Sequence, residues 1–201
     1  MVEELVKFSK LASEPLDRFY EIFQEASINT DQPNAMILST SGKRNFPDSR
    51  VVLLKEVSDE GFIFFSNYNS KKGEDISFNN QASILFWWES IEKQVRISGL
   101  IERIPESDSI EYFNTRSKLS RIAAYTSNQS TKIESYEELQ QIYKKNIERF
   151  KSEEILKPKT WGGYILKPQS FEFWSSHPDR LHQRERYDCE NNCWNHYYLS
   201  P

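Results

Sequence analysis

Glycine, cysteine and methionine are scarce in this 201-residue chain, which holds six, two and two of them. No Gly-x-Gly-x-x-Gly turn occurs, which argues against the glycine-rich phosphate turn of a Rossmann dinucleotide site. No run approaches the roughly 20 apolar residues of a membrane-spanning helix. The first residues, Met1-Val2-Glu3-Glu4, are acidic rather than signal-like. We therefore expect a cytoplasmic protein that does not enter a membrane.

An excess of basic charge is also missing. The chain has 26 Lys and Arg against 30 Asp and Glu, a net charge of −4, which argues against general nucleic-acid binding. The two cysteines, Cys189 and Cys193, flank Glu190-Asn191-Asn192 in a sequence typical of a hairpin, where they could face each other. A reduced pair fits a cytosolic protein, and no second Cys or His pair has zinc-ligand spacing, so no metal site is predicted.

The chain is instead rich in aromatic residues and in short extended runs. Helix-start signals stand at Ser13-Glu14-Pro15 and at the capping box Ser135-Tyr136-Glu137-Glu138, whose helix should run to about Lys151. Shorter helices are expected at Ser70–Asn79, Pro105–Thr115 and Ser117–Ser127. Expected strands are Ala35–Ser41, Arg50–Val57, Gly61–Asn67, Ala82–Glu89, Lys93–Ile104, Trp161–Lys167, Ser170–Ser175, Leu181–Cys189 and Trp194–Leu199. Without repeats or linkers, this pattern predicts one α+β domain around a small antiparallel barrel.

Two arginines and a histidine lie close together near the C-terminus. Arg180, His182 and Arg184 share one parity, so an extended strand over 181–189 would direct all three to one face. That face is either an ordinary solvated surface or a binding surface for a planar anion. Other segments with matching chemistry favour the anion.

Three of these segments carry cations. Ser70-Lys71-Lys72-Gly73 begins a helix directly after a strand, where free backbone N–H groups and two lysines suit a phosphate. The strand Arg50–Lys55 looks buried and central, so its terminal cations need a partner. Tyr112, Arg116 and Ser120 recur at every fourth position and would share one face of an unbroken helix.

Neutral groups complete the pattern. Gln94 and the pair Gln129-Ser130 offer donors and acceptors of the kind that read the edge of a heterocycle. Together the segments call for two phosphate sites and a ring system.

In these residues the chain resembles the pyridoxamine 5′-phosphate oxidase family, flavoproteins of the FMN-binding split-barrel fold. The resemblance runs from about Pro33 to Pro201. The matching motifs, in the family's order, are Arg50–Lys55, Phe65-Ser66-Asn67, Ser70-Lys71-Lys72, Lys93-Gln94-Val95-Arg96, Tyr112-Phe113 with Arg116, Gln129-Ser130, Trp161-Gly162-Gly163, Glu172-Phe173-Trp174 and Arg180-Leu181-His182 with Arg184.

The resemblance implies a role for each matched position. FMN would be held by Arg50, Val51, Leu53, Lys55, Phe65, Ser66, Lys71, Lys72, Gln94, Gln129, Ser130, Trp174 and Arg184. The substrate would be held by Lys55, Tyr112, Arg116, Ser120, Arg180 and His182, of which Arg180 and His182 would be the catalytic pair. The implied reaction oxidises pyridoxamine or pyridoxine 5′-phosphate with dioxygen to pyridoxal 5′-phosphate and hydrogen peroxide, in vitamin B6 biosynthesis or salvage.

The resemblance also implies an assembly and a division of the chain. Family members are homodimers with FMN at the subunit interface. Residues 1–201 would form one split-barrel domain, with 1–32 as an N-terminal helical segment and 160–201 as C-terminal strands completing the site.

Two positions depart from the family pattern. Gln183 stands where the family usually has Asp, and Tyr198 where it commonly has Arg. Two alternatives therefore stay open: a related split-barrel flavin oxidase acting on another ring, such as the phenazine-forming branch, or a non-catalytic FMN- or pyridoxal-phosphate-binding relative.

Overall fold

The computed structural model describes residues 6–201. The acidic stretch Met1-Val2-Glu3-Glu4, from which we expect no signal peptide, lies outside this range. Among the described residues, no helix combines the length and apolar character needed to cross a membrane.

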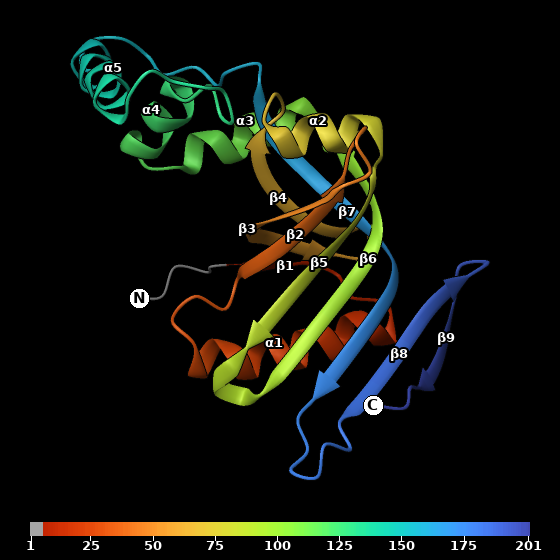
Figure 1. The fold of residues 1–201 in the computed structure, drawn as a ribbon. Coiled ribbons are helices and arrows are strands. Elements are labelled where there is room, and N and C mark those ends of the chain that lie inside the picture. The colour runs from red at the N-terminus through yellow and green to blue at the C-terminus, as the bar shows by residue number, and fades with distance from the viewer. Residues whose placement is uncertain (1–5) are drawn as a thin grey trace.

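Six strands close an antiparallel barrel (Figure 1). They are β2 (Ala35–Ser41), β3 (Pro47–Ser58), β4 (Gly61–Asn67), β5 (Gln81–Trp88), β6 (Lys93–Arg103) and β7 (Trp161–Ser175). Hydrogen-bonded neighbours follow the ring β3-β2-β5-β6-β7-β4, and β4 pairs with β3 to close it. The expected α+β fold with an antiparallel barrel is confirmed.

Three further strands extend this sheet. The short β1 (Lys7–Phe8) pairs with β3 in parallel. Strands β8 (Gln183–Glu190) and β9 (Cys193–Tyr198) form a hairpin that continues from the last part of β7.

Helices cover two ends of the barrel. Helix α1 (Glu14–Asn29) lies at one end, and α2 (Lys71–Phe78) and α3 (Glu106–Thr115) lie at the other (Figure 1). Helices α4 (Lys118–Thr126) and α5 (Tyr136–Arg149) project beyond α3, and a 3-10 turn, η1 (Glu89–Ile91), joins β5 to β6. The Ser70, Ser117 and Ser135 side chains cap α2, α4 and α5 by accepting the N–H three residues on.

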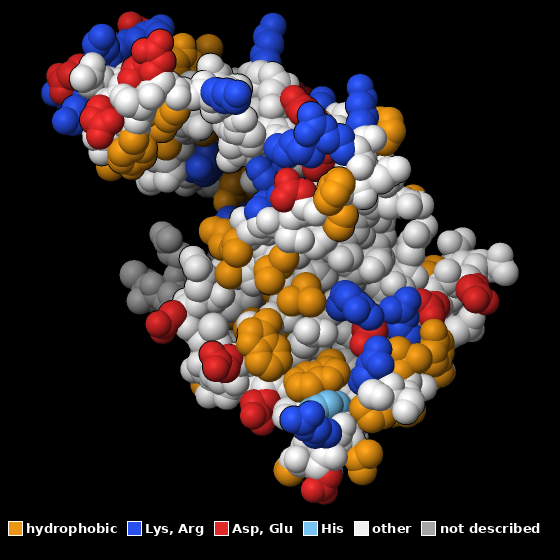
Figure 2. Space-filling model, in the orientation of Figure 1, with side chains coloured by type: hydrophobic (Ala, Val, Ile, Leu, Met, Phe, Trp, Pro, Cys, Tyr) orange, Lys and Arg blue, Asp and Glu red, His pale blue; other side chains and the backbone are white. Residues whose placement is uncertain are grey.

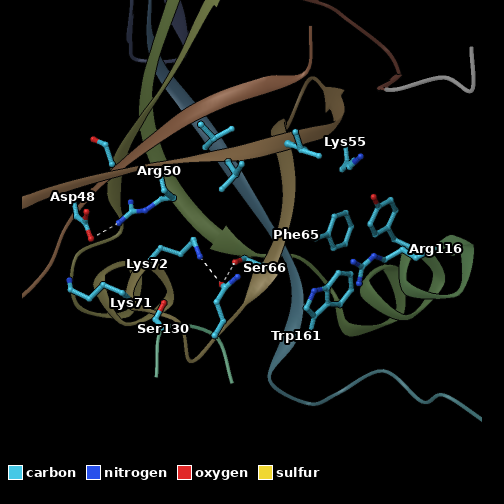
Figure 3. Close-up of a pocket in the computed structure, with 16 residues that line it drawn as sticks. Asp48, Arg50, Lys55, Phe65, Ser66, Lys71, Lys72, Arg116, Ser130 and Trp161 are labelled. Atoms are coloured by element: carbon cyan, nitrogen blue, oxygen red, sulfur yellow. Dashed lines mark hydrogen bonds and ion pairs between the residues drawn. The ribbon is translucent and has the colours of Figure 1, made fainter. Parts of the chain in front are cut away.

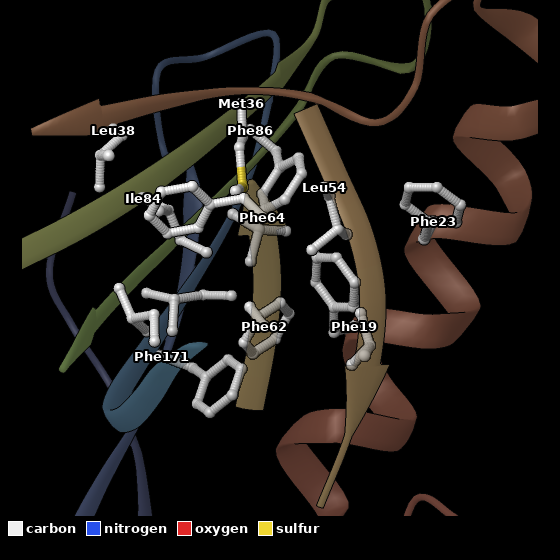
Figure 4. Close-up of a cluster of buried hydrophobic side chains, with 14 of the residues drawn as sticks. Phe19, Phe23, Met36, Leu38, Leu54, Phe62, Phe64, Ile84, Phe86 and Phe171 are labelled. Carbon is white, nitrogen blue, oxygen red and sulfur yellow. The ribbon is translucent and has the colours of Figure 1, made fainter. Parts of the chain in front are cut away.

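The main core fills the barrel and reaches α1 (Figure 4). Phe19 of α1 packs edge-on against Phe62 of β4, with ring centroids 5.0 Å apart, and contacts Phe86 of β5 at 5.2 Å. A second cluster, formed by Phe113, Ile122, Phe150, Ile155 and Trp161, lies beneath α3, α4 and α5. The helical overhang is therefore packed onto the start of β7.

The last part of the barrel differs from expectation in one respect. Residues 161–175 form one continuous strand rather than two. Its pairing with β6 shifts register between Ser98 and Gly99, where Ser98 is opposite Ser170 and Gly99 is opposite Pro168, so Gln169 is accommodated as a bulge. Gly99 allows the close approach, because a Cβ there would lie 2.0 Å from the Lys167 carbonyl oxygen.

Two sequence expectations about β3 and the C-terminal hairpin are wrong. Strand β3 is interior to the sheet order, but its outer face is open and Val51 is 64% exposed. In the hairpin, Cys189 lies opposite Trp194 and Cys193 lies opposite Glu190. Because neighbouring residues on a strand alternate faces, Cys189 and Cys193 point to opposite sides of the ribbon.

Candidate active site

A pocket of about 580 Å³ opens between the barrel and the helices (Figure 3). Figure 2 shows the surface hollowed at this level, between the α4–α5 overhang and the barrel. Its lining residues are Asp48, Ser49, Arg50, Val51, Val52, Leu53, Lys55, Phe65, Ser66, Lys71, Lys72, Tyr112, Arg116, Gln129, Ser130 and Trp161. They include most of the residues that the sequence analysis assigned to FMN and half of those assigned to the substrate.

One end of the pocket carries Arg50, Lys71 and Lys72. Arg50 donates to the Thr40 hydroxyl at 2.8 Å and pairs with Asp48 at 3.0 Å, while Lys71 pairs with the buried Asp75. Lys72 forms no ion pair within residues 6–201. Burial lowers the pKa of Lys72, and the nearby Arg50 guanidinium lowers it further. This end is therefore suited to a phosphate group.

Two neutral side chains hold Lys72 in place. The Lys72 ammonium donates to the Gln129 Oε1 atom at 2.7 Å and to the Ser70 hydroxyl at 3.2 Å. The Ser66 hydroxyl also donates to Gln129, at 3.2 Å (Figure 3). Ser130 follows with φ at +69°, in the left-handed region that a non-glycine residue rarely adopts. Such a conformation persists only where its surroundings hold it, which fits a loop closing over a ligand.

A second cation group, Lys55 and Arg116, stands at the other end. Burial lowers the pKa of Lys55, and the Arg116 charge lowers it further. Burial likewise lowers the pKa of Arg116, and its Nη1 atom is buried without a hydrogen-bond partner in the described part of the chain. A buried cationic donor without a partner is costly unless a ligand satisfies it, so this end fits a second anion.

Aromatic rings line the wall beside this second group. Phe65 stacks on Tyr112 with centroids 3.8 Å apart, and on Trp161 at 5.3 Å. The Arg116 guanidinium lies over the Trp161 ring at 4.8 Å. The second anion site is therefore bounded by flat apolar surface that suits a planar ring.

Ser120 does not join this group. Helix α3 ends at Thr115, and Arg116 is extended with ψ at 149°, so no unbroken helix carries Tyr112, Arg116 and Ser120. Ser117 begins the next helix by accepting the Ser120 N–H at 3.2 Å, and its hydroxyl lies 2.8 Å from that of Ser120. The expectation of one shared helical face is wrong, because a serine at this break makes a good cap.

Gln94, Trp174 and Arg184 lie elsewhere, side by side on β6, β7 and β8. Gln94 is opposite Trp174, and Trp174 is opposite Arg184. None of the three lines the pocket. Trp174 is near the end of β7 and Trp161 is at its start, a separation on the order of 40 Å along an extended strand. Within one chain, these residues and the pocket form two separate groups.

Arg180 and His182 are close to this second group but are not on a strand. Strand β8 begins only at Gln183, and Arg180 ends a turn with φ at +60°. The expected single strand face for Arg180, His182 and Arg184 is therefore wrong. The His182 ring still packs against Trp174, with centroids 4.6 Å apart.

Sequence reasoning missed the carboxylates that hold the cations. Glu172 is 2% exposed and accepts Arg184 Nε at 3.0 Å and Nη2 at 2.9 Å, and it also pairs with Arg96. Asp75 is 3% exposed and accepts the Thr40 hydroxyl at 3.0 Å as well as Lys71. The available signal for Glu172 was an acid flanked by Phe171 and Phe173 inside an expected strand.

Two family models match this chain. The model for pyridoxamine 5′-phosphate oxidase matches residues 23–152, and the model for the pyridoxine 5′-phosphate oxidase C-terminal dimerisation region matches residues 161–201. The chain belongs to the pyridoxamine 5′-phosphate oxidase family. The first match holds every pocket-lining residue except Trp161, and the second holds Trp161, Trp174, Arg180, His182 and Arg184.

Curated relatives agree with this assignment. The chain is 41% identical over 189 residues to the pyridoxine/pyridoxamine 5′-phosphate oxidase of Nostoc sp., covering 93% of this chain and 88% of that protein. It is also 41% identical over 198 residues to the chloroplastic pyridoxine/pyridoxamine 5′-phosphate oxidase 1 of Arabidopsis thaliana. That match covers 96% of this chain but 37% of the plant protein, so the chain spans little more than a third of its length.

A solved structure gives a close match in fold. PhzG from Burkholderia lata 383, in complex with tetrahydrophenazine-1-carboxylic acid, aligns with a TM-score of 0.89 and 27% identity. The alignment covers 100% of this chain and 98% of PhzG.

Proposed function

We propose that this protein is an FMN-dependent oxidase that converts pyridoxamine or pyridoxine 5′-phosphate into pyridoxal 5′-phosphate, with dioxygen as acceptor and hydrogen peroxide as product. The observation that carries the proposal is the pair of cation groups in one pocket. Arg50, Lys71 and Lys72 suit the phosphate of one ligand, and Lys55 with Arg116 suits that of another. FMN and a phosphorylated pyridine each carry one phosphate group, so two ligands would occupy the two cation groups.

The residues present fit FMN. Three cations, the N-terminus of α2 and the polar pair Gln129 and Ser130 surround one end of the pocket, and these are the donors that a phosphate ester requires. When bound, FMN would supply the two-electron redox chemistry between the substrate and dioxygen.

The chain's own residues bind and orient the substrate. Lys55, Tyr112 and Arg116 hold its phosphate, and the stacked Phe65, Tyr112 and Trp161 rings exclude water from one side of the second anion site. Arg180 and His182 lie with the distant Trp174 group, so in this proposal they come from the second copy of the chain and cover the substrate ring on its far side. Ser120 does not line the pocket and is given no role in this proposal.

We further propose that the protein acts as a homodimer with FMN at the subunit interface. Gln94, Trp174 and Arg184 lie on the order of 40 Å along β7 from the pocket of their own chain, too far to touch the same flavin. A two-fold dimer can bring these residues of one copy to the pocket of the other. Exposed apolar side chains on the barrel face, Ile37, Val51 and Trp87, are available for such a contact (Figure 2).

Mixed dimers test the shared site. Lys72→Met and Arg184→Gln each damage both sites of their own homodimer, whereas a mixed dimer has one doubly damaged and one intact site. With random assortment, about a quarter of the wild-type activity should return. The matched control mixes Lys72→Met with Arg116→Met. Because both residues line the pocket of one chain, each pocket of this mixed dimer carries one substitution and no intact site forms. Equal activity in the two mixtures would exclude a site shared between chains.

The division of the chain remains part of the proposal. Residues 1–201 form one domain in which 1–32 is an N-terminal helical segment and 160–201 supplies the strands that complete the partner's site. A cytoplasmic location is likewise proposed.

One competing function has a specific observation in its favour. The likeness to PhzG, whose complex holds a phenazine carboxylic acid, favours a flavin oxidase acting on a tricyclic ring. Against it, two half-buried cations at the substrate end, Lys55 and Arg116, suit a phosphate dianion better than a single carboxylate. Anaerobic bleaching of the flavin by pyridoxamine 5′-phosphate, with recovery in air, tests the proposed function. Bleaching by a reduced phenazine carboxylate alone would support the competing one, and no bleaching by either would support a non-catalytic relative.

A further inference from the structure

The residues before β8 form a strained turn that carries Arg180. The Arg180 N–H donates to the His177 carbonyl oxygen at 3.0 Å, and Pro178 occupies the second position of the turn, where its fixed φ is favourable. Arg180 itself has φ at +60°, in the left-handed region that disfavours residues with a Cβ. Because such a conformation persists only where neighbouring contacts enforce it, the contacts around this turn decide where Arg180 points.

One of those contacts comes from His182. The backbone N–H of His177, the first residue of the turn, donates to the His182 Nδ1 atom at 3.2 Å. The Asp179 N–H donates to His177 Nδ1 at 3.3 Å, which closes the turn internally. The His182 ring is placed for its bond by packing on Trp174, with centroids 4.6 Å apart and planes inclined by 40°.

This hydrogen bond fixes the chemistry of the ring. A ring nitrogen that accepts an N–H has its lone pair engaged and carries no proton, so the neutral imidazole holds its proton on Nε2. Nε2 is then a hydrogen-bond donor. In this form His182 cannot take a proton from the substrate through Nε2.

We propose that His182 is a positioning residue whose Nδ1 atom fastens the turn 177–180 and thereby presents Arg180, while its Nε2–H faces outward as a donor. The contact of Arg180 with substrate rests on the function proposed above; the tautomer and the bond to His177 do not. The family resemblance implied a catalytic His182, and this inference assigns the ring a different task.

Two variants of His182 test the roles of its two ring nitrogens separately. In His182→Asn the amide oxygen can occupy the Nδ1 position and accept the His177 N–H, but nothing replaces Nε2. In His182→Gln the amide reaches the Nε2 position and leaves the His177 N–H without its acceptor. His196→Asn is the control, because it removes another of the chain's three histidines, on β9 and away from this turn.

The first measurement is nitrogen NMR of the FMN-loaded protein, with the three histidines assigned through single substitutions. At alkaline pH we expect His182 to carry its proton on Nε2. We expect the His177 amide signal to be unchanged in His182→Asn and His196→Asn and displaced in His182→Gln. A proton on His182 Nδ1, or a His177 amide that is indifferent to His182→Gln, would overturn the proposal. These readouts need no turnover, so they stand apart from a failure of the proposed oxidase activity.

The second measurement places Arg180→Ala in each background and follows kcat/KM for pyridoxamine 5′-phosphate. If His182 acts through Arg180, the loss caused by Arg180→Ala should be as large in His182→Asn as in the wild type. It should be smaller in His182→Gln by about three- to tenfold, the usual worth of one hydrogen bond. The same Arg180→Ala loss in all backgrounds would show that the turn does not depend on His182.

Discussion

Replacing Lys72 by Met should weaken FMN binding without weakening the fold. Lys72 is 8% exposed, and its ammonium contacts Gln129 and Ser70 but pairs with no carboxylate in residues 6–201. Methionine keeps an unbranched chain of similar length and removes the charge. If the Lys72 charge serves a ligand, its loss should weaken FMN binding and spare stability. If the charge serves the fold, its loss should lower stability and spare FMN binding.

The magnitude of the binding loss follows from the contact. One charge-assisted hydrogen bond to a phosphate is worth about 1.5–3 kcal/mol, so the Kd for FMN should rise by roughly 10- to 150-fold.

The stability effect has the opposite sign. Burial, with the Arg50 charge, lowers the pKa of Lys72 in the folded state. The folded protein therefore holds this proton less tightly than the unfolded chain, and the charged ammonium costs stability at neutral pH. That cost disappears only as the pH rises through the lowered pKa toward the ordinary lysine value of about 10.5. The Lys72→Met variant avoids this cost, so its apoprotein should melt at the same temperature as the wild type or higher.

FMN titration followed by flavin fluorescence gives the Kd, and thermal melting of the apoprotein gives the stability. Lys71→Met is the matched comparison, because Lys71 is the neighbouring lysine on the same helix but its side chain is half exposed and paired with Asp75. Its effect on the Kd should be smaller. If Lys72→Met lowered the melting temperature of the apoprotein by several degrees and left the Kd unchanged, Lys72 would be a structural residue and the phosphate assignment would fail.

Three further predictions concern other buried groups. Arg116→Met should raise KM for pyridoxamine 5′-phosphate by roughly 10-fold or more and leave the FMN content unchanged, as measured by steady-state kinetics and absorbance. Burial raises the pKa of Tyr164 to about 12, so stability should fall as the pH rises from about 10 to about 12; Tyr164→Phe should flatten this fall in urea unfolding. Glu172→Gln should destabilise the fold by about 1.5–3 kcal/mol in the same urea unfolding measurement, because the buried carboxylate accepts charge-assisted hydrogen bonds from the partly exposed Arg96 and Arg184.

Local signals in the sequence predicted most helices and strands correctly. Ser70 and Ser135 cap the helices that they were expected to begin, and strands 35–41 and 61–67 have the expected bounds. These features depend on neighbours within a few residues. The break between the helices at 105–115 and 117–127 was also expected, but the helical spacing of Tyr112, Arg116 and Ser120 wrongly suggested one shared face across it.

The residue types at the site could be predicted from the sequence, but not which of them lie together in one chain. Cations and hydroxyls in separate segments indicated two anion sites, and the segments of Arg50, Lys72 and Arg116 do line one pocket. The distance of Gln94 and Arg184 from it depends on how β6, β7 and β8 pair, which is a tertiary property. A strand of 15 residues can join two sites that a linear motif presents as one.

The two departures from the family pattern matter less than the sequence suggests. Gln183 and Tyr198 are both exposed, at the first residue of β8 and the last of β9. The partners of Arg184 are instead Glu172 on β7 and the Ser200 carbonyl oxygen, which accepts Arg184 Nη1 at 2.9 Å. Because a buried carboxylate on the adjacent strand already orients this guanidinium, a carboxylate at position 183 is not needed to hold it. The loss of that acid is therefore compatible with the proposed flavin contact of Arg184 and with the proposed oxidase.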